Sequence, residues 1–369
     1  MTAVRLARLN RNGVSFWLDG ISRFLLDSKA LAALVRDWRV SGATTNLELF
    51  LHAVNTGPAY TEQLCSLAEL GGDLNQAVQE LAVRDIQWAC DVLLPTHLAR
   101  HHTTGLVSAD MDPRVCHDQH TTLDMARTLW RAVDRPNILV KIPATDAGLR
   151  AITSCLAEGI NVHATSIFSA ERYQQVTEAH LTGLSLASEA GLPLSRIHSA
   201  ASFHVSPIDA AVDPLLTAVG SDRALALRGK TALAAAGAVL ERHKETFAGT
   251  AWQQHARRGA RRQQLVWAAT TVNDSRYHDT HYTDGLFAPD TVSIVSEQSL
   301  WAVADHGRVL PHEVAGVERE RVLDALPMWG ISLPEIGSRL EDDAHRRALA
   351  VWQHLLDVVR AALKQYRTH

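Results

Sequence analysis

Lys141 stands in the middle of ILVKIPATDAG (138–148), a run that otherwise predicts a buried β-strand. A buried ammonium group is unfavourable unless it is paired with a negative charge or loses its proton. A neutral lysine amine attacks carbonyl compounds and forms a Schiff base. The residue therefore predicts either covalent carbonyl chemistry or a buried ion pair.

The ion-pair alternative is a structural lysine held by an internal carboxylate such as Asp19 or Asp110. Polar residues at matching heights on the other predicted strands argue for chemistry instead. They are Asp19, Thr44, Asn46, Asp110, His163, Thr165 and Ser202. So many polar groups around one lysine are costly in a core and usual in an active site.

Eight short apolar or β-branched runs predict the strands that position these residues. They cover residues 15–20, 41–46, 105–111, 138–144, 161–167, 198–205, 264–270 and 291–296. The segments between them show helical periodicity, for example at 123–133 and at 171–191, which ends on a glycine that suits a helix C-cap. Eight strand–helix units predict the α/β class and a (β/α)₈ TIM-type barrel, because parallel strands with right-handed crossovers close in this way. An open dinucleotide-binding sheet is disfavoured, since no Gly-x-Gly-x-x-Gly turn follows the first strand.

We expect residues 1–369 to form a single barrel domain that carries additional helices. One helical insertion is expected at about 221–262, and C-terminal helices at about 313–367. In a barrel of this kind, the side chains at the C-terminal ends of the strands face the active-site mouth. Lys141 lies near the end of the fourth strand, so it belongs to that mouth.

The composition is that of a soluble globular enzyme, with 46% hydrophobic residues, 21% charged residues and a formal net charge of −4. This charge gives no reason to expect nucleic acid or a membrane surface as a partner. No apolar stretch approaches the ~20 residues that span a bilayer, and the N-terminus lacks the apolar segment of a signal peptide, so we expect a cytoplasmic protein. Cys65, Cys90, Cys116 and Cys155 form no Cys-x-x-Cys pair, and we expect buried thiols.

Six blocks of the sequence resemble those of the transaldolase family, in the same order. They are WLDGISR, SGATTNLELF, VSADMDPR, ILVKIPATDAGLRAI, GINVHATSIFSAERYQQV and LPLSRIHSAASFHVS, and the similarity extends from about residue 14 to the C-terminal helices. The resemblance implies a barrel fold independently of the strand count. It also implies aldol chemistry through a lysine Schiff base.

The resemblance assigns roles to individual residues. Lys141 would form the Schiff base, and Asp19 would be the acid/base that handles the acceptor hydroxyl during carbon–carbon bond cleavage and formation. Asn46 and Ser202 would bind hydroxyls of a dihydroxyacetone unit. Thr44 and Thr165 would orient their neighbours and the catalytic water. The catalytic candidates are thus Lys141, Asp19, Asp110 and Thr165, and the substrate-binding candidates are Thr44, Asn46, His163, Ser202, His204, Thr271, Asn273 and Arg276.

Several positions depart from the family pattern. Asp110 replaces the usual Glu, which would draw the carboxylate back by ~1.5 Å, and a misplacement of that order slows a step by ~100-fold. His163 replaces the usual Asn; it is either a titratable group of the site or a polar residue that fills space. Pro207 stands where an arginine usually follows the serine, and AATTVND (268–274) replaces the usual serine and basic residue. Neutral Thr271 and Asn273 would replace charge-assisted phosphate donors poorly.

Other cations are the remaining candidates for a phosphate contact. RRGARR (257–262) precedes the seventh strand and so belongs to the opposite mouth, where we expect a solvated helix face. Arg276, Arg172 and His278 could reach the correct mouth. His278 and His281 form a His-x-x-His pair without a third ligand in view, so we expect no metal site.

Three hypotheses follow. The first is a transaldolase-like Schiff-base enzyme that makes or breaks a carbon–carbon bond next to a ketone, on a non-standard substrate of specialised metabolism. Within this hypothesis, an ordinary pentose-phosphate transaldolase remains an alternative if Arg276 or its neighbours supply a phosphate site. The second is a lysine-iminium enzyme that catalyses a non-aldol condensation or cyclisation, with Asp110 and His163 as acid and base. The third is a catalytically dead barrel that serves as a scaffold. We expect no cofactor, a small carbonyl or sugar substrate, and a homodimer as one oligomeric state.

Overall fold

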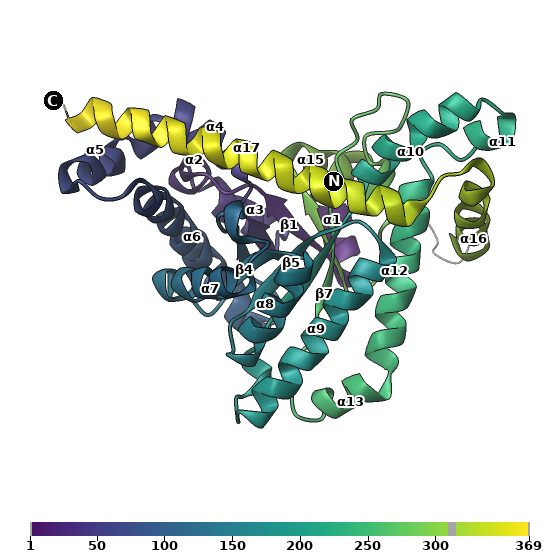
Figure 1. Cartoon of the computed structure of the whole chain (residues 1–369), viewed down its shortest axis with the longest axis horizontal. Coiled ribbons are helices and arrows are strands. Elements are labelled where there is room, and N and C mark those ends of the chain that lie inside the picture. The colour runs from purple at the N-terminus through teal and green to yellow at the C-terminus, as the bar shows by residue number, and fades with distance from the viewer. Residues whose placement is uncertain (1, 309–314, 368–369) are drawn as a thin grey trace.

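Eight parallel strands close into one barrel in the computed structural model, which describes residues 2–308 and 315–367 (Figure 1). Each strand pairs with the next in sequence, and the barrel closes through β1 and β8, where Val14 lies opposite Thr291. The strands are β1 (Val14–Asp19), β2 (Gly42–Thr44), β3 (Leu106–Ala109), β4 (Ile138–Pro143), β5 (Val162–Ile167), β6 (Ser199–His204), β7 (Gln264–Ala268) and β8 (Thr291–Val295). The predicted (β/α)₈ barrel and its eight strands are confirmed.

Alternation along the strands separates the interior of the barrel from its helical shell. Leu139 of β4 packs in the barrel interior with side chains such as Trp17, whereas Ile138 and Val140 pack into the outer core. Lys141 is two residues beyond Leu139, so it shares the inward side. Gly42 makes room in this interior, because a Cβ there would lie 2.5 Å from the Trp17 indole nitrogen.

Helices follow the strands and cover the outside of the barrel. The N-terminal half contains α1 (Thr2–Arg11), α2 (Arg23–Asp27), α3 (Ala30–Trp38), α4 (Leu47–Thr56), η1 (Pro58–Tyr60), α5 (Thr61–Leu70), α6 (Leu74–Ala99), η2 (Pro113–Val115), α7 (Gln119–Val133) and α8 (Asp146–Ala157). The C-terminal half contains α9 (Ala170–Glu189), η3 (Leu194–Arg196), α10 (Ser206–Val219), α11 (Asp222–Leu225), α12 (Thr231–Ala248), α13 (Thr250–Ala256), α14 (His281–Gly285), α15 (Glu297–His306), α16 (Ala315–Ala325), η5 (Leu326–Trp329) and α17 (Leu333–Arg367). None of these helices is long and apolar enough to cross a membrane.

Three predicted helical regions, at 171–191, at about 221–262 and at about 313–367, can be compared with the helices of the structure. Gly191 lies two residues after the end of α9 with a φ of 76°, and it donates its backbone N–H to the Ser188 carbonyl, as expected for a glycine at a helix C-terminus. The expected insertion contains α11, α12 and α13, and the expected C-terminal helices are α16 and α17. Residues 313 and 314 of that second prediction lie outside the described residues.

Two predictions about individual segments were wrong. RRGARR is not a helix face, because α13 ends at Ala256 and the run forms the turn and loop before β7, with Gly259 at a φ of 82°. Its place at the N-terminal mouth is confirmed. Cys65 is only partly buried, although Cys90, Cys116 and Cys155 are buried thiols as expected.

α17 is the longest helix, and it crosses the C-terminal mouth of the barrel (Figure 1). Its apolar side packs with α4, α5 and α6 in a second core that includes Phe50, Leu64 and Leu355. Further contacts join it to η2 and α10, which follow β3 and β6. The helix therefore ties together elements that begin after different strands.

Candidate active site

Lys141 projects into the C-terminal mouth and contacts two residues that directly follow strands, Thr45 after β2 and Asp110 after β3. Its Nζ lies 3.0 Å from Asp110 Oδ1 and donates a hydrogen bond of 2.7 Å to the Thr45 carbonyl oxygen. The two side chains of the ion pair keep 12% and 20% of their surface exposed. The lysine is thus mostly withdrawn from water yet open to a small molecule at the mouth.

Thr45 holds both partners of this pair. Its hydroxyl donates to Asp110 Oδ2 at 2.7 Å and accepts the Asp110 backbone N–H at 2.7 Å. Its backbone N–H donates to the Ser108 carbonyl, which anchors it against β3. The sequence interpretation missed Thr45, because its neighbours Thr44 and Asn46 carried the expected roles. The only signal was its place between them in SGATTN.

Asp19 and Asn46 form a second polar pair at the mouth. Asn46 Nδ2 donates to both carboxylate oxygens of Asp19 at 3.3 Å, while its Oδ1 accepts from the backbone N–H groups of Glu48 and Leu49 and caps α4. Burial raises the pKa of Asp19 above 3.8, although the charge of Lys141 and the Asn46 hydrogen bond oppose the change. A carboxyl group with a raised pKa is suited to exchange protons with a substrate hydroxyl.

His163 lies beside Lys141 in the strand register and bridges two serines. Its Nδ1 is 2.6 Å from the Ser108 hydroxyl, and its Nε2 is 2.5 Å from the Ser202 hydroxyl. Burial and, secondly, the charge of Lys141 hold the pKa of His163 well below 6.5, so the imidazole is neutral. A neutral ring donates through one nitrogen and accepts through the other, which fits a serine on each side. Ser108 was also missed from the sequence.

Thr165 and His204 form a third polar pair. The Thr165 hydroxyl lies 3.1 Å from His204 Nε2, and the His204 ring lies 5.0 Å from the Phe168 ring. Burial, with a smaller effect of the Lys141 charge, lowers the pKa of His204 to about 4. The charge of Lys141 contributes to the pKa shifts of Asp19, His163 and His204.

The loop after β7 holds the remaining substrate-binding candidates apart from this cluster. Thr271, Asn273 and Arg276 are exposed, and within residues 2–308 and 315–367 no hydrogen bond joins their side chains to Lys141. The Arg276 Nε instead donates to the Asp274 carboxylate at 2.9 and 3.0 Å. Arg172 is engaged in the same way, by Asp146 at 2.9 Å and by Glu341 at 3.2 Å. Two of the three candidate cations for a phosphate contact, Arg172 and Arg276, are therefore already paired with carboxylates.

His278 and His281 do not converge. His281 Nε2 lies 2.7 Å from the Gly229 carbonyl oxygen, whereas His278 lies beside Asp279 and His306. His278, Asp279 and His306 form one group of residues of types that ligate metals. Cys116, His117 and His345 form another, in which Cys116 Sγ lies 3.2 Å from His345 Nδ1. That contact is of the length of a hydrogen bond to sulfur and joins η2 to α17.

Beside the lysine cluster lies a small cavity of about 100 Å³ under α17. Asn46 and Asp110 line it together with mostly apolar side chains, among them Phe50, Met111 and Trp352. α17 thus contributes a wall next to the polar groups of the mouth. This cavity is small, and the larger hollow of the molecule lies at the other mouth of the barrel.

Comparison with known proteins identifies the family of the chain. Residues 16–359 match the family model described as transaldolase/fructose-6-phosphate aldolase. The chain is 43% identical over 365 residues to Transaldolase 1 of Streptomyces avermitilis, which covers 98% of this chain and 97% of that one. It is 44% identical over 360 residues to a transaldolase of Thermobifida fusca, covering 97% and 98% of the two chains. A family match across most of the chain and relatives of this similarity show that the protein belongs to the transaldolase family.

Proposed function

We propose that Lys141 is the Schiff-base residue of this transaldolase-type enzyme. The observation that carries the proposal is the position of its Nζ, 3.0 Å from Asp110 Oδ1 at the mouth where β3 and β4 end. A carboxylate at hydrogen-bond distance can remove the proton that keeps the lysine from acting as a nucleophile. The protein is a transferase of lysine Schiff-base chemistry, and the proposal assigns that chemistry to this residue.

The proposed reaction makes or breaks a carbon–carbon bond next to a ketone. The neutral Lys141 amine adds to the donor carbonyl, and loss of water gives an iminium ion. Asp19 then takes the proton of the hydroxyl on the β carbon, two carbons from the iminium carbon. The bond between the α and β carbons breaks, the β carbon becomes the carbonyl carbon of the leaving aldehyde, and the electron pair of the bond passes to the iminium to give an enamine. An aldehyde leaves. A second aldehyde takes its place, the enamine attacks its carbonyl carbon, and Asp19 returns the proton to the new hydroxyl. Water then adds to the re-formed iminium, which releases the product ketone and the Lys141 amine.

The remaining candidates would orient the donor. Asn46 lies 3.3 Å from Asp19, so a hydroxyl bound there would also face that carboxylate. Ser202 is held by His163, and Thr165 by His204, which fixes two hydroxyl groups near the lysine. Thr44 is buried and donates to the Thr45 carbonyl at 3.1 Å, so it supports the residue that contacts Lys141.

For the substrate, we favour a donor or acceptor that carries no phosphate at the usual end. Arg276 and Arg172 are paired with carboxylates, Pro207 has no side-chain donor, and Thr271 and Asn273 are neutral. Such a substrate would fit a role in specialised metabolism. The ordinary sugar-phosphate reaction is the alternative, and the identity to relatives named transaldolase supports it. A phosphate that displaced Asp274 from Arg276 would recover a cationic contact.

Two further alternatives use the same residues differently. An iminium formed at Lys141 could lead to a non-aldol condensation or cyclisation, which would not require Asp19 as a base. A dead barrel would keep Lys141 only as the partner of Asp110, and the ion pair itself is the observation in favour of that reading. Asp19→Asn separates the first alternative from aldol transfer, and a trapped adduct excludes the second.

The first experiment is borohydride reduction followed by intact-protein mass spectrometry. Dihydroxyacetone, fructose and fructose 6-phosphate are offered separately to the wild type, to Lys141→Arg and to Lys244→Arg. Lys141→Arg keeps a positive charge beside Asp110 but forms no imine, whereas Lys244 pairs with Glu241 on the surface and serves as the matched control. An adduct in the wild type and in Lys244→Arg, but not in Lys141→Arg, supports the assignment.

The preference among the sugars tests the substrate proposal. A stronger adduct with fructose than with its phosphate supports the uncharged substrate, and the reverse order supports the ordinary transaldolase. An adduct that persists in Lys141→Arg contradicts the assignment of Lys141. The expected homodimer stays a prediction, and light scattering checks it against the 40.4 kDa of one chain.

A further inference from the structure

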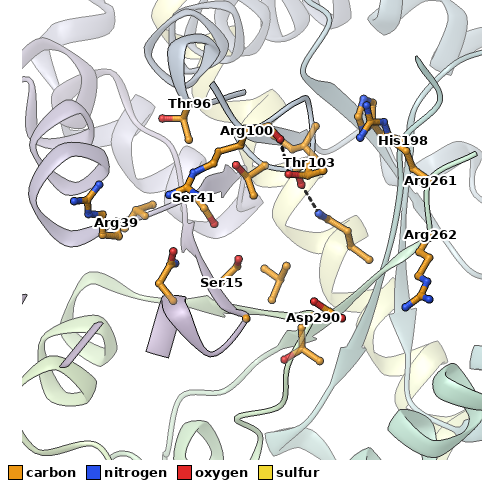
Figure 2. Close-up of a pocket in the computed structure, with 18 of the residues that line it drawn as sticks. Ser15, Arg39, Ser41, Thr96, Arg100, Thr103, His198, Arg261, Arg262 and Asp290 are labelled. Atoms are coloured by element: carbon orange, nitrogen blue, oxygen red, sulfur yellow. Dashed lines mark hydrogen bonds between the residues drawn. The ribbon is translucent and has the colours of Figure 1, made fainter. Parts of the chain in front are cut away.

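A second hollow lies at the N-terminal mouth of the barrel, on the opposite side from Lys141. Its volume is about 1080 Å³, and residues near the starts of strands line it, such as Ser15 and Ser41 (Figure 2). Gln264, the first residue of β7, also lines it. The active-site candidates, by contrast, lie where strands end. The two cavities are therefore separated by the packed interior of the barrel, in which Trp17, Leu139 and Val266 meet.

The lining of this N-terminal cavity is strongly cationic. It includes Arg39, Arg100, Arg261 and Arg262, and its one carboxylate is Asp290. The Arg261 Nε donates to the Ser195 carbonyl at 2.7 Å. In the part of the chain that the structure describes, the guanidinium groups of the other three arginines make neither a hydrogen bond nor an ion pair. This differs from Arg172 and Arg276 at the catalytic mouth, which are held by carboxylates.

The four arginines form two pairs on opposite sides of the cavity (Figure 2). Arg39 follows the end of α3 and Arg100 follows the end of α6, and these two helices pack together. Arg261 and Arg262 come from the loop before β7, on the other side. Each side thus presents two positive charges, of which those of Arg39, Arg100 and Arg262 are on exposed side chains. The guanidinium group is the side chain best suited to bind phosphate oxygens.

Polar groups without partners lie in the wall of this cavity. The buried oxygens Thr104 Oγ1, Gln263 Oε1 and Gln264 Oε1 make no hydrogen bond within the described chain, and Gln263 itself is fully buried. The amide of Gln264 is held by its Nε2, which donates to the Thr103 carbonyl at 2.8 Å. Burial and the charge of Arg261 lower the pKa of the neighbouring His198 to about 3, which agrees with a positive field at this wall. These unpartnered oxygens are buried from solvent, so the contacts to a ligand in the cavity would come from the arginines.

We propose that the N-terminal cavity binds a small anion with two phosphate groups. The two arginines on each side carry two positive charges, which match the charge of one phosphate dianion. A ligand with only one carboxylate group at each end would leave one positive charge on each side uncompensated. The volume reaches the upper range of small-molecule sites, so a bisphosphorylated metabolite fits. The site lies apart from the lysine chemistry, and its ligand is an effector or a stabilising ion rather than a substrate.

Isothermal titration calorimetry with a ligand that has no carbonyl group tests the proposal. Glucitol 1,6-bisphosphate cannot form a Schiff base, and it is titrated into protein that carries Lys141→Arg, so the outcome does not depend on the proposed catalytic role. The test variant adds Arg39→Gln and Arg262→Gln. The matched control adds Arg223→Gln and Arg347→Gln, which remove the same charge from two exposed arginines elsewhere.

We expect saturable binding that weakens at least tenfold in the test variant and changes less than twofold in the control. Orthophosphate should bind at least tenfold more weakly than the bisphosphate, because it can engage only one pair of arginines. The proposal is overturned if the bisphosphate does not bind at millimolar concentration, or if both double variants lose the same affinity. Equal affinity for orthophosphate would refute the two-ended site.

Discussion

Replacing Thr45 by valine isolates the contacts that position the carboxylate next to Lys141. Valine keeps the shape of the side chain but has no hydroxyl, so the hydrogen bond to Asp110 Oδ2 and the one from the Asp110 backbone N–H, both of 2.7 Å, are lost. The Thr45 carbonyl that accepts from Lys141 Nζ belongs to the backbone and remains. The substitution therefore changes the placement of Asp110 more than that of the lysine.

The two lost contacts set the expected magnitude. A hydrogen bond to a charged group stabilises a protein by about 1.5–3 kcal/mol and a neutral one by about 0.5–1.5 kcal/mol. Because Asp110 keeps 20% of its side-chain surface exposed, water can replace part of this, and we expect a loss of about 1–3 kcal/mol in the free energy of unfolding. A carboxylate displaced by ~1 Å slows the step that it assists by ~100-fold.

Two measurements separate positioning from stability. Urea denaturation gives the change in the free energy of unfolding, and the rate of Lys141 adduct formation under borohydride gives the chemical effect. Thr45→Ser is the matched control, because it keeps the hydroxyl and should retain an adduct rate within about threefold of the wild type. If Thr45→Val lowers stability but leaves the adduct rate within twofold of the wild type, then Asp110 does not assist Schiff-base formation and our reasoning fails.

Three other predictions follow from the structure. Because burial raises the pKa of Asp19 above 3.8, the acid limb of the pH profile of kcat/KM should lie above that pH. Asp19→Asn should lower aldol transfer by ~10²–10⁴-fold. An acid limb that persists in the pH profile of this variant would contradict the assignment. Arg23→Met should lower the free energy of unfolding by about 3–5 kcal/mol, measured by urea denaturation. Asp85 would lose its buried partner at 2.8 Å and keep the hydrogen bond from the Tyr60 hydroxyl at 2.7 Å. A loss below about 1 kcal/mol would argue against a stabilising ion pair. Acid should destabilise the fold from pH 6.5 downwards, because the folded-state pKa of each buried histidine lies below its unfolded value and the unfolded chain therefore binds protons first. At pH 5.5 each neutral buried histidine lowers the free energy of unfolding by up to about 1.4 kcal/mol. Denaturation at pH 7.5 and 5.5 checks the summed effect of His163, His180, His198, His204 and His243.

The sequence alone was enough to predict those site residues whose direction follows from the alternation of side chains along a strand. Lys141 is a charge within an apolar run, and Asp19 and Ser202 are polar residues at the interior face of their strands, so one rule predicted all three. The structure places them at one mouth because parallel strands of similar length end together. This part of the site follows from local pattern and from topology.

Thr45 and the arginines could not be predicted in the same way. Thr45 acts through its backbone carbonyl and through a hydroxyl that lies beyond the end of β2, and a strand pattern does not report on either group. Arg276 was a candidate because its loop follows β7, but a sequence does not show that Asp274, two residues earlier, would occupy its guanidinium group. RRGARR was expected on a helix, although Gly259 has the left-handed backbone that ends one. Such local competition between side chains decides which charges remain available to a ligand.

The course of α17 has a consequence for how new specificity could be engineered. Its principal contacts include α4, η2 and α10, which follow β2, β3 and β6, so an insertion after any of those strands would have to lift a helix of 35 residues. The segment between β7 and α14 borders the same mouth and carries exposed Thr271 and Asn273. Asp274 and Arg276 pair within it, and after them the Tyr277 hydroxyl donates to Asp213 of α10. Segments of this kind tolerate changes in length. Libraries that vary this loop should therefore yield folded proteins with altered substrate range more often than libraries that vary the loops under α17.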